Sequence, residues 1–316
     1  MLAVFALALP GPASGGTLSA SGNAMLSRLA TAVQSCNAGA HTAQAALPFV
    51  VGDRAIGLVL PKVADQLRRF GDVYSVSESS VRLLAGGDSV AARSQAIMAT
   101  LETMRDDESV PMLRGWRSET WPMKRSFFDA PEVLIERAAV PMFGCAAYGC
   151  FVNGLVAGDR IWIARRSRTK QTYPGLLDLL AAGGLAHGEK PRDNVLKECQ
   201  EEASIPRELA ALARPAGYVA YTSVDESGWG IKRDTLFVYD LVLPETFVPV
   251  PSDGEVESFE LMQICDVIRS LADRPEIWKP NVRIVLCDMF VRLGHLTPDQ
   301  DGYLELVSNL RMHGGR

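Results

Sequence analysis

The stretch GGLAHGEKPRDNVLKECQEEASI, residues 183–205, joins a glycine-containing loop to a segment with strong helical periodicity. Pro191 suits the first turn of a helix, and Pro206 ends it. At about 100° per residue, the apolar residues and the glutamates fall on neighbouring arcs that do not overlap. The segment therefore predicts a helix over 191–203 with a core face and an acidic face. The core face holds Val195, Leu196, Cys199 and Ala203, and the acidic face holds Glu198, Glu201 and Glu202.

Glutamates at i, i+3 and i+4 repel one another, by roughly 0.2 to 0.5 kcal/mol per pair in an isolated helix. A hard divalent cation with oxygen ligands, usually Mg²⁺, would compensate for this repulsion. A solvated acidic surface is the alternative for any glutamate-rich helix. The loop favours the cation site, because Gly183, Gly184 and Gly188 allow backbone groups to approach a ligand.

The whole arrangement resembles the Nudix box of diphosphate hydrolases, G-x5-E-x7-R-E-U-x-E-E-x-G-U, where U is apolar. Lys197 replaces the arginine and keeps its charge without the bidentate fork. Ser204 replaces the last glycine, which predicts a less extreme backbone there. A P-loop is excluded, because Glu189 takes the place of its lysine and no Ser or Thr follows Lys190. The matching positions are Gly183, Glu189, Glu198, Cys199, Glu201, Glu202 and Ile205.

The resemblance covers nearly all of the chain from Met25 onward. It is carried by the box and by residues 135–154, 161–184, 237–244 and 279–290, together with Trp116, Arg117 and Glu119. These stretches are similar to the Nudix subgroup associated with thiamine pyrophosphokinase, in which Lys197 and Ser204 are both expected. The resemblance implies an α/β (α+β) fold class, a Nudix α/β/α sandwich preceded by a smaller α+β domain.

The resemblance also implies a site for Mg²⁺ or Mn²⁺ on the box helix. Its metal ligands would be Glu198, Glu201, Glu202 and the carbonyl of Ala182. Glu189 would support the site by orienting Lys197. The general base would be Glu201 or a glutamate outside the box, where Glu255 is preferred to Glu257; a plain surface position is the alternative for both.

A basic loop precedes the box and contains Arg165, Arg166, Arg168 and Lys170. Beside an acidic metal site, these cations are predicted to neutralise the terminal phosphate of a substrate, with Arg165 and Lys170 as the first choices. A solvated surface is again the alternative. Gly183 and Gly184 are expected to bring the backbone close to the bound substrate.

The subgroup resemblance implies hydrolysis of thiamine diphosphate, or of its oxidised oxo and oxy analogues, to a monophosphate and phosphate. Trp116 and Trp121 are interpreted as core residues, with an aromatic recognition surface as the alternative. One competing function is an isopentenyl-diphosphate isomerase, which would need a reactive cysteine such as Cys145 or Cys150. Another is a non-catalytic Nudix module that senses a ligand, although such modules often lose box acids.

The chain has 316 residues and a net charge of -5, enough length for two domains and too little positive charge for a general nucleic-acid binder. The six scattered cysteines predict reduced thiols and a cytoplasmic location. No stretch approaches the roughly 20 apolar residues of a membrane span. The expected partner is a small diphosphate, and a homodimer is allowed. The predicted organisation is an extension over 1–24, an α+β domain over 25–140 and the Nudix domain over 141–316.

The apolar run Leu2 to Leu9 has no preceding positive residue, so we expect translation to begin at Met25 rather than a cleaved signal. Met25 would open a helix with Leu26, Leu29 and Val33 on one face. Further helices are expected from Pro61, over 89–104, 266–271 and 282–293. Strands are expected over 73–76, 148–156, 160–164, 218–223 and 235–243.

Overall fold

The computed structural model describes residues 20–312. Its larger unit is a seven-stranded sheet in the order β11-β12-β7-β8-β13, with β10 paired to β7 and β9 paired to β8. The β12–β7 pair is parallel, and the other pairs are antiparallel. The strands are β7 (Ala146–Val156), β8 (Arg160–Arg166), β9 (Leu177–Asp178), β10 (Ala181–Gly184), β11 (Arg214–Val224), β12 (Ile231–Val242) and β13 (Val256–Gln263).

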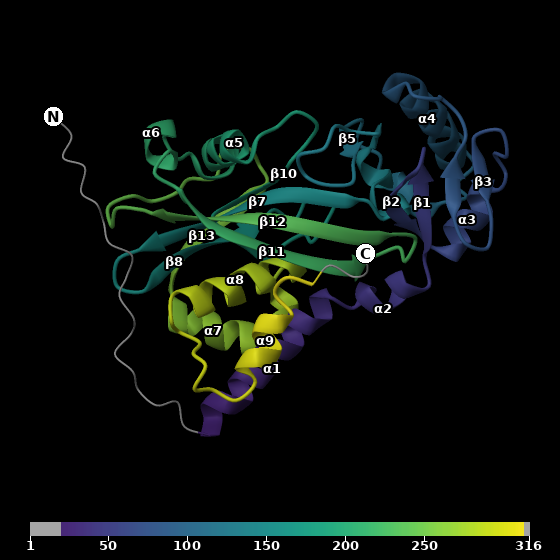
Figure 1. Ribbon diagram of the computed structural model, residues 1–316. Coiled ribbons are helices and arrows are strands. Elements are labelled where there is room, and N and C mark those ends of the chain that lie inside the picture. The colour runs from purple at the N-terminus through teal and green to yellow at the C-terminus, as the bar shows by residue number, and fades with distance from the viewer. Residues whose placement is uncertain (1–19, 313–316) are drawn as a thin grey trace.

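Helices cover both faces of this sheet (Figure 1). One face carries α5 (Pro191–Ala203) and α6 (Arg207–Ala210), over an apolar cluster that includes Val195 and Cys199. The other face packs against α1 (Ala20–Cys36), α7 (Ile264–Asp273), α8 (Pro280–Arg292) and α9 (Tyr303–Ser308). These three layers confirm the predicted α/β/α sandwich.

The smaller unit confirms the predicted α+β domain. Its four-stranded sheet has the order β2-β1-β4-β3, and a separate hairpin joins β5 to β6. Phe143 and Ile231 belong to its apolar core, so that core continues into the start of the larger unit. The elements are α2 (Gly39–Gln44), β1 (Leu47–Val51), β2 (Arg54–Val59), α3 (Pro61–Leu67), β3 (Tyr74–Val76), β4 (Val81–Leu83), α4 (Val90–Asp106), η1 (Pro111–Gly115), β5 (Thr120–Met123), β6 (Val133–Glu136), η2 (Arg137–Ala139) and η3 (Pro141–Phe143).

Local signals located most elements correctly. The box helix spans Pro191–Ala203 as predicted, α3 begins at Pro61, and Ser89 caps α4 by accepting from the Ala92 amide at 3.3 Å. The predicted strands over 148–156, 160–164 and 218–223 lie within longer strands of the large sheet, and the strand predicted over 235–243 overlaps β12, which ends at Val242. Strand ends were underestimated because residues such as Arg214 and Lys232 lack β-propensity, and pairing with a neighbouring strand keeps them extended.

The first helix differs from the prediction. It begins at Ala20 rather than at Met25, and Leu26, Leu29 and Val33 are fully buried as expected. They pack with α7 and α8 in the core of the larger unit, not in the smaller one. Residues 26–36 therefore contribute to the second half of the chain, while the division at residue 140 stays a prediction. The apolar run Leu2–Leu9 lies outside the described residues.

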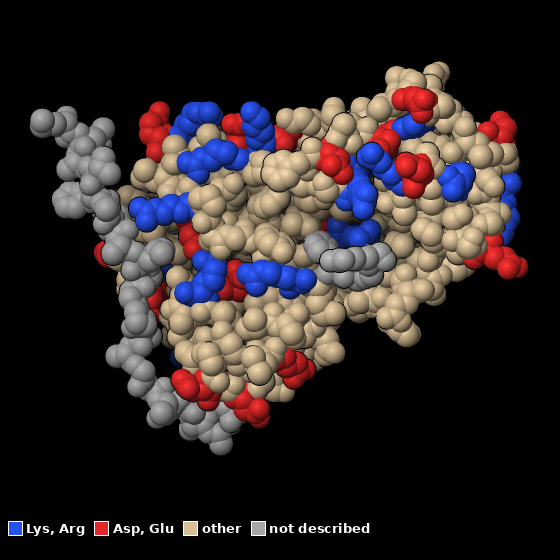
Figure 2. Space-filling model, in the orientation of Figure 1, with Lys and Arg blue, Asp and Glu red and all other residues tan. Residues whose placement is uncertain are grey.

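On the face seen in Figure 2, basic and acidic side chains are interspersed rather than gathered into one band. Within the described range, no helix combines the length and apolar character of a bilayer span. All six cysteines are free thiols, and Cys265 is the exposed one among them.

Candidate active site

The box helix ends where the backbone turns into the left-handed region. Ser204 has φ 52° and ψ 32°, the conformation that glycine usually provides at this position. The expectation of a less extreme backbone was therefore wrong. The Ser204 hydroxyl donates to the Val250 carbonyl at 2.8 Å, and the Ile205 amide donates to the Cys199 carbonyl at 3.0 Å. These bonds hold the helix end in a conformation that a serine side chain disfavours.

Glu202 is the most deeply placed acid of the box, with 6% of its surface exposed. One carboxylate oxygen accepts from the Ala182 amide on β10 at 2.8 Å. Burial and then the charge of Asp178 raise the pKa of Glu202 well above its ordinary value, because burial removes the water that would stabilise the ionised form; the bond from the Ala182 amide and the charge of Lys279 oppose this only in part. A carboxylate in this situation is a strong candidate for a metal ligand.

The loop before β13 adds two acids to Glu202. Carboxylate oxygens of Glu202, Asp253 and Glu255 lie within 4.8 Å of one another, a grouping that could hold a metal ion. Asp253 Oδ1 also accepts from the Glu255 amide at 2.8 Å, which shapes the loop. Glu255 was predicted here, whereas Asp253 was missed. Its only local signal was the Asp-Gly turn, and pairing of β13 with β8 moves that turn toward the box helix.

Glu198 lies beside this group without belonging to it. Lys197 Nζ is 3.2 Å from Glu198 and 3.0 Å from Glu189, so the lysine connects the two acids. Burial raises the pKa of Glu198, and Lys197 partly opposes that effect. Burial alone would lower the pKa of Lys197, but its bonds to the two glutamates outweigh burial and raise it. The direct contact between Glu189 and Lys197 supports the prediction that Glu189 orients this lysine. The catalytic role of Lys197 stays a prediction.

Side chains of the protein itself leave no space for a Cβ at two of the loop glycines. A Cβ at Gly183 would lie 2.1 Å from Glu198 Oε1, and a Cβ at Gly184 would lie 2.7 Å from Trp121 Cη2. Gly188 adopts a φ of 86°, which few other residues tolerate. The sequence interpretation, in which Gly183 and Gly184 open space for a ligand, is therefore incomplete: both positions are already in contact with side chains that line the site.

The basic loop divides between two environments. Arg166 is buried and donates to Asp178 at 2.9 Å and to the carbonyls of Thr172 and Tyr173, which ties the loop together. Lys170 forms an ion pair with Glu255. Arg165 does not line the cavity and donates to the Gly175 carbonyl at 3.0 Å. Neighbouring residues of a strand point to opposite faces, so the first choice of Arg165 is not supported by its position.

Two other predicted positions lie outside the cavity. Arg168 is exposed and sits 3.8 Å from Glu257, which is itself partly exposed. The structure therefore brings Glu255, and not Glu257, next to the box acids. Glu201 lines the cavity from the exposed side of α5, and Ala182 lines it from β10. Their assigned roles as base, ligand or both stay predictions.

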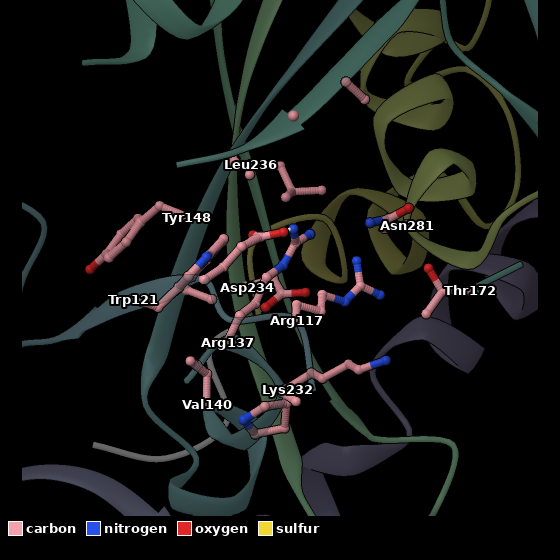
Figure 3. A pocket seen from close by; sticks show the side chains of 18 of the residues that line it. Arg117, Trp121, Arg137, Val140, Tyr148, Thr172, Lys232, Asp234, Leu236 and Asn281 are labelled. Atoms are coloured by element: carbon pink, nitrogen blue, oxygen red, sulfur yellow. The ribbon is translucent and has the colours of Figure 1, made fainter. Parts of the chain in front are cut away.

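These groups border a cavity of about 730 Å³, which is within the usual size of a small-molecule site. We call its first side the acid wall, where Glu198, Glu201, Asp253 and Glu255 line the cavity. Glu202 is counted with this wall because its carboxylate lies within 4.8 Å of those of Asp253 and Glu255, although it does not itself line the cavity. The second wall comes from both halves of the chain, and Figure 3 labels all of its side chains except Tyr221. It consists of Arg117, Trp121, Arg137, Tyr221, Asp234 and Asn281.

Trp121 of the smaller unit packs against β10, the strand that contains Gly183 and Gly184 of the box. The side chain is 7% exposed, its ring touches Gly184, and Arg137 stacks on it at 5.1 Å from the ring centroid. Trp116 packs against the core of the smaller unit, with Arg105 over its ring at 4.6 Å. Trp116 is thus absent from the cavity lining, whereas Trp121 is both a core residue and part of the wall.

The inner part of the second wall is a hydrogen-bonded acid. The hydroxyl of Tyr221 donates to Asp234, and the Asn281 amide approaches that hydroxyl at 3.5 Å. Burial raises the pKa of Asp234, opposed by its bond from Tyr221 and by the charges of Lys232, Arg137 and Lys279. The Asn281 side-chain oxygen is buried and has no hydrogen-bond partner among the described residues. This side can therefore accept hydrogen bonds from a ligand.

The donor set of the acid wall fits a divalent cation. It offers hard carboxylate oxygens from α5 and from the β13 loop, the ligand type that Mg²⁺ and Mn²⁺ prefer. Glu202 is buried and forms no ion pair with any described residue, so binding a metal there would remove an electrostatic penalty. The cavity beside it has room and cationic groups for a phosphorylated small molecule.

Comparison with known proteins agrees with this geometry. Residues 147–282 match the family model described as "NUDIX domain", and residues 28–147 match "Domain of unknown function (DUF4743)". "Nudix hydrolase 20, chloroplastic" and "Nudix hydrolase 24, chloroplastic" from Arabidopsis thaliana are each 37% identical, over 88% of this chain and 76% of the relative. "Isopentenyl-diphosphate Delta-isomerase" from Cereibacter sphaeroides is 24% identical over 44% of this chain and 76% of its own length.

The fold, the box helix and these relatives define the class: the chain belongs to the Nudix hydrolase family. It is an enzyme, a pyrophosphohydrolase that cleaves diphosphate linkages in small molecules. Enzymes of this family use divalent metals such as Mg²⁺ or Mn²⁺.

Proposed function

We propose that this enzyme hydrolyses thiamine diphosphate, or better its oxidised oxo and oxy analogues, to the monophosphate and inorganic phosphate. The observation that carries the proposal is one cavity with two chemically different walls. The acid wall suits a metal-bound diphosphate, and the second wall offers an indole, a tyrosine and hydrogen-bond acceptors to a heteroaromatic end. The similarity to the subgroup associated with thiamine pyrophosphokinase supports this substrate class.

In the proposed reaction, water attacks the terminal phosphorus and the bond from that phosphorus to the bridging oxygen breaks. The proton of the water passes to Glu201 or Glu255, and the organic monophosphate leaves with the bridging oxygen. Glu202, Asp253 and Glu255 would hold Mg²⁺ or Mn²⁺, with Glu198 and the Ala182 carbonyl as further candidates. When bound, the metal supplies charge neutralisation and a water of lowered pKa.

The basic residues of the site would neutralise the diphosphate. Lys170 is paired with Glu255, so a phosphate group can compete for its ammonium group once the glutamate takes part in metal binding. Lys197 would hold Glu198 and Glu189 in place. Arg166 would act mainly by fixing the loop that carries Lys170, because its donors are already bonded to Asp178 and to backbone carbonyls.

The similarity to an isomerase makes that activity the second candidate. Cys145 is the cysteine that borders the cavity, and burial raises the pKa of its thiol to about 12. A neutral, buried thiol is poorly suited to take a proton from carbon. Release of inorganic phosphate separates the two functions, because an isomerase releases none. A metal-dependent phosphate assay also separates hydrolysis from a sensing module, which would bind a ligand without turnover.

The decisive experiment compares kcat/KM for thiamine diphosphate, its oxo and oxy forms, ADP-ribose and dNTPs with Mg²⁺ and with Mn²⁺. That ratio reports differential binding of the transition state. We expect the oxidised thiamine compounds to be the best substrates and thiamine diphosphate to be used less efficiently. If a nucleotide exceeds every thiamine compound by about tenfold or more, the thiamine assignment is wrong while the Nudix chemistry stands. A cytoplasmic location is part of the proposal, supported by the free thiols.

A further inference from the structure

Arg117 is held at the edge of the cavity by the backbone around it. It lies between η1 and β5, and its amide donates at 2.9 Å to Glu136, a buried carboxylate that also accepts from the Ala138 amide at 3.2 Å. The next residue, Ser118, has a φ of 58°, an unfavourable conformation for a residue with a side chain. Such strain persists only where the surrounding contacts enforce it. The position of Arg117 is therefore specified by the structure.

The guanidinium of Arg117 has no matched acid, unlike Arg137, Lys170 and Lys279 of the same cavity; among the described residues, Lys232 and Arg233 also line the cavity without an acid partner. Arg137 is paired with Glu119 at 2.8 Å, and Lys279 is paired with Asp178 at 2.8 Å. In the described part of the chain, no side chain forms a hydrogen bond or an ion pair with the Arg117 guanidinium. Partial burial lowers the pKa of Arg117, and the neighbouring charge of Arg137 lowers it further. A bound anion would relieve both effects.

Arg117 lines the same cavity as the acid wall. The charges of Glu119, Glu255 and Glu136 all act on it, and Glu255 is a member of the acid wall. Trp121, four residues later in the chain, packs on Gly184 and so fixes the segment that contains Arg117 against β10. Figure 3 shows Arg117, Arg137 and Asp234 in the same part of the cavity. A planar guanidinium with unused donors suits the paired oxygens of a phosphoryl group.

We propose that Arg117 binds the diphosphate of the substrate, so that the region matching the domain of unknown function completes the active site. Arg117 donates to non-bridging phosphoryl oxygens from the second wall while the acid wall holds the metal. This inference rests on the proposed diphosphate chemistry, but not on thiamine as the organic group. It also gives the smaller unit a direct part in substrate binding.

The first test measures binding of inorganic pyrophosphate with Mg²⁺ by calorimetry. Arg117→Gln removes the charge, Arg117→Lys keeps the charge without the fork, and Arg114→Gln is the control. Arg114 is 68% exposed and is paired with Glu108. We expect affinity to fall roughly 10- to 100-fold for Arg117→Gln, as for other lost bonds to a charged group. Arg117→Lys should be intermediate, and Arg114→Gln should bind as wild type.

The second test is chemical rescue of turnover. Arg117→Ala should raise KM more than it lowers kcat, and added guanidinium chloride at millimolar concentration should restore part of the activity. Potassium chloride at equal ionic strength should not. A merely structural role for Arg117 predicts no rescue.

The outcomes separate this inference from the proposed function. Equal pyrophosphate affinity of wild type and Arg117→Gln overturns the role of Arg117. The same conclusion follows if the wild-type protein binds no pyrophosphate. It also follows if Arg114→Gln loses as much pyrophosphate affinity as Arg117→Gln. If wild type binds pyrophosphate through Arg117 yet hydrolyses none of the diphosphates, the proposed function fails instead. If wild type turns over and the Arg117→Gln and Arg117→Ala variants both match it, only the inference about Arg117 is wrong.

Discussion

The two walls of the cavity were assembled from the chain in different ways. Most of the acid wall comes from one helix, with Glu198, Glu201 and Glu202 within five residues of one another. The second wall combines residues from η2, β5, β11, β12 and α8 with Arg117, and no two of them are sequence neighbours. A site whose functional residues lie at fixed spacing on one helix can be recognised in a sequence. A site whose residues come from several distant elements, and are brought together only by the fold, cannot be recognised in this way.

The largest expected effect tests the acid wall. Glu202→Gln should lower kcat by about 100-fold or more, the scale for loss of one transition-state contact. The fold should persist, because the amide oxygen can still accept from Ala182. Metal-dependent phosphate release, circular dichroism and thermal melting would show this. Glu208→Gln on α6, an exposed position, is the matched control, and near-normal turnover of Glu202→Gln in Mg²⁺ would refute the site.

The next effect tests the contact between Trp121 of the second wall and Gly184 of β10. Gly184→Ala should destabilise the protein by about 1 to 3 kcal/mol, the usual cost of overpacking, because the new Cβ meets the Trp121 ring. Trp121→Phe removes the ring atoms involved, so Gly184→Ala should cost less in that background. Chemical denaturation of the four proteins of this cycle gives the coupling. Gly71→Ala, where the space is open, should be nearly neutral. Additive effects would mean that Trp121 and Gly184 are not in contact.

A smaller effect concerns Lys197. Lys197→Arg should be tolerated, whereas Lys197→Ala should lose about tenfold or more in kcat/KM, because loss of a residue that orients ligands typically costs 10- to 100-fold. Only the alanine variant removes the positive partner of Glu189 and Glu198. Steady-state kinetics at saturating metal is the measurement. A fully active Lys197→Ala enzyme would reduce this lysine to a surface residue.

The smallest effect is a pH dependence in the second wall. The pKa of Asp234 is raised in the folded protein, so the native state binds its proton more tightly than the unfolded chain. Its contribution to stability is thus full below the unfolded pKa of about 4 and is lost as pH rises through the folded pKa. Asp234→Asn has no such loss, and its melting temperature relative to wild type should increase with pH between 4 and 7. A difference that is constant across this range contradicts the predicted burial effect.

The sequence predictions were accurate where the interactions are between residues close in the chain, and less accurate where they are between distant segments. Pro191, the apolar periodicity and the spacing of the glutamates are local, and they located the box helix to the residue. The choice between Arg165 and Arg166 depended on which face of β8 meets the cavity, and the sequence pattern of the loop contained no information on that. The predicted start of α1 at Met25 relied on the apolar periodicity, which begins there, whereas the helix begins at Ala20. The sequence also did not show which core that apolar face joins: it packs with α7 and α8, more than 200 residues away in the chain.

The sequence by itself determined the chemistry of the box: acids on one helical face, a lysine between two of them, and a fold that can hold a metal and a diphosphate. Only the tertiary structure decided that Asp253 joins Glu202 and Glu255, that Trp121 packs on Gly184, and that Arg117 lines the same cavity as the acid wall. The physical reason is that helix periodicity and capping act over a few residues. The position of a loop or an isolated side chain depends on strand pairing and on core packing between segments far apart in sequence.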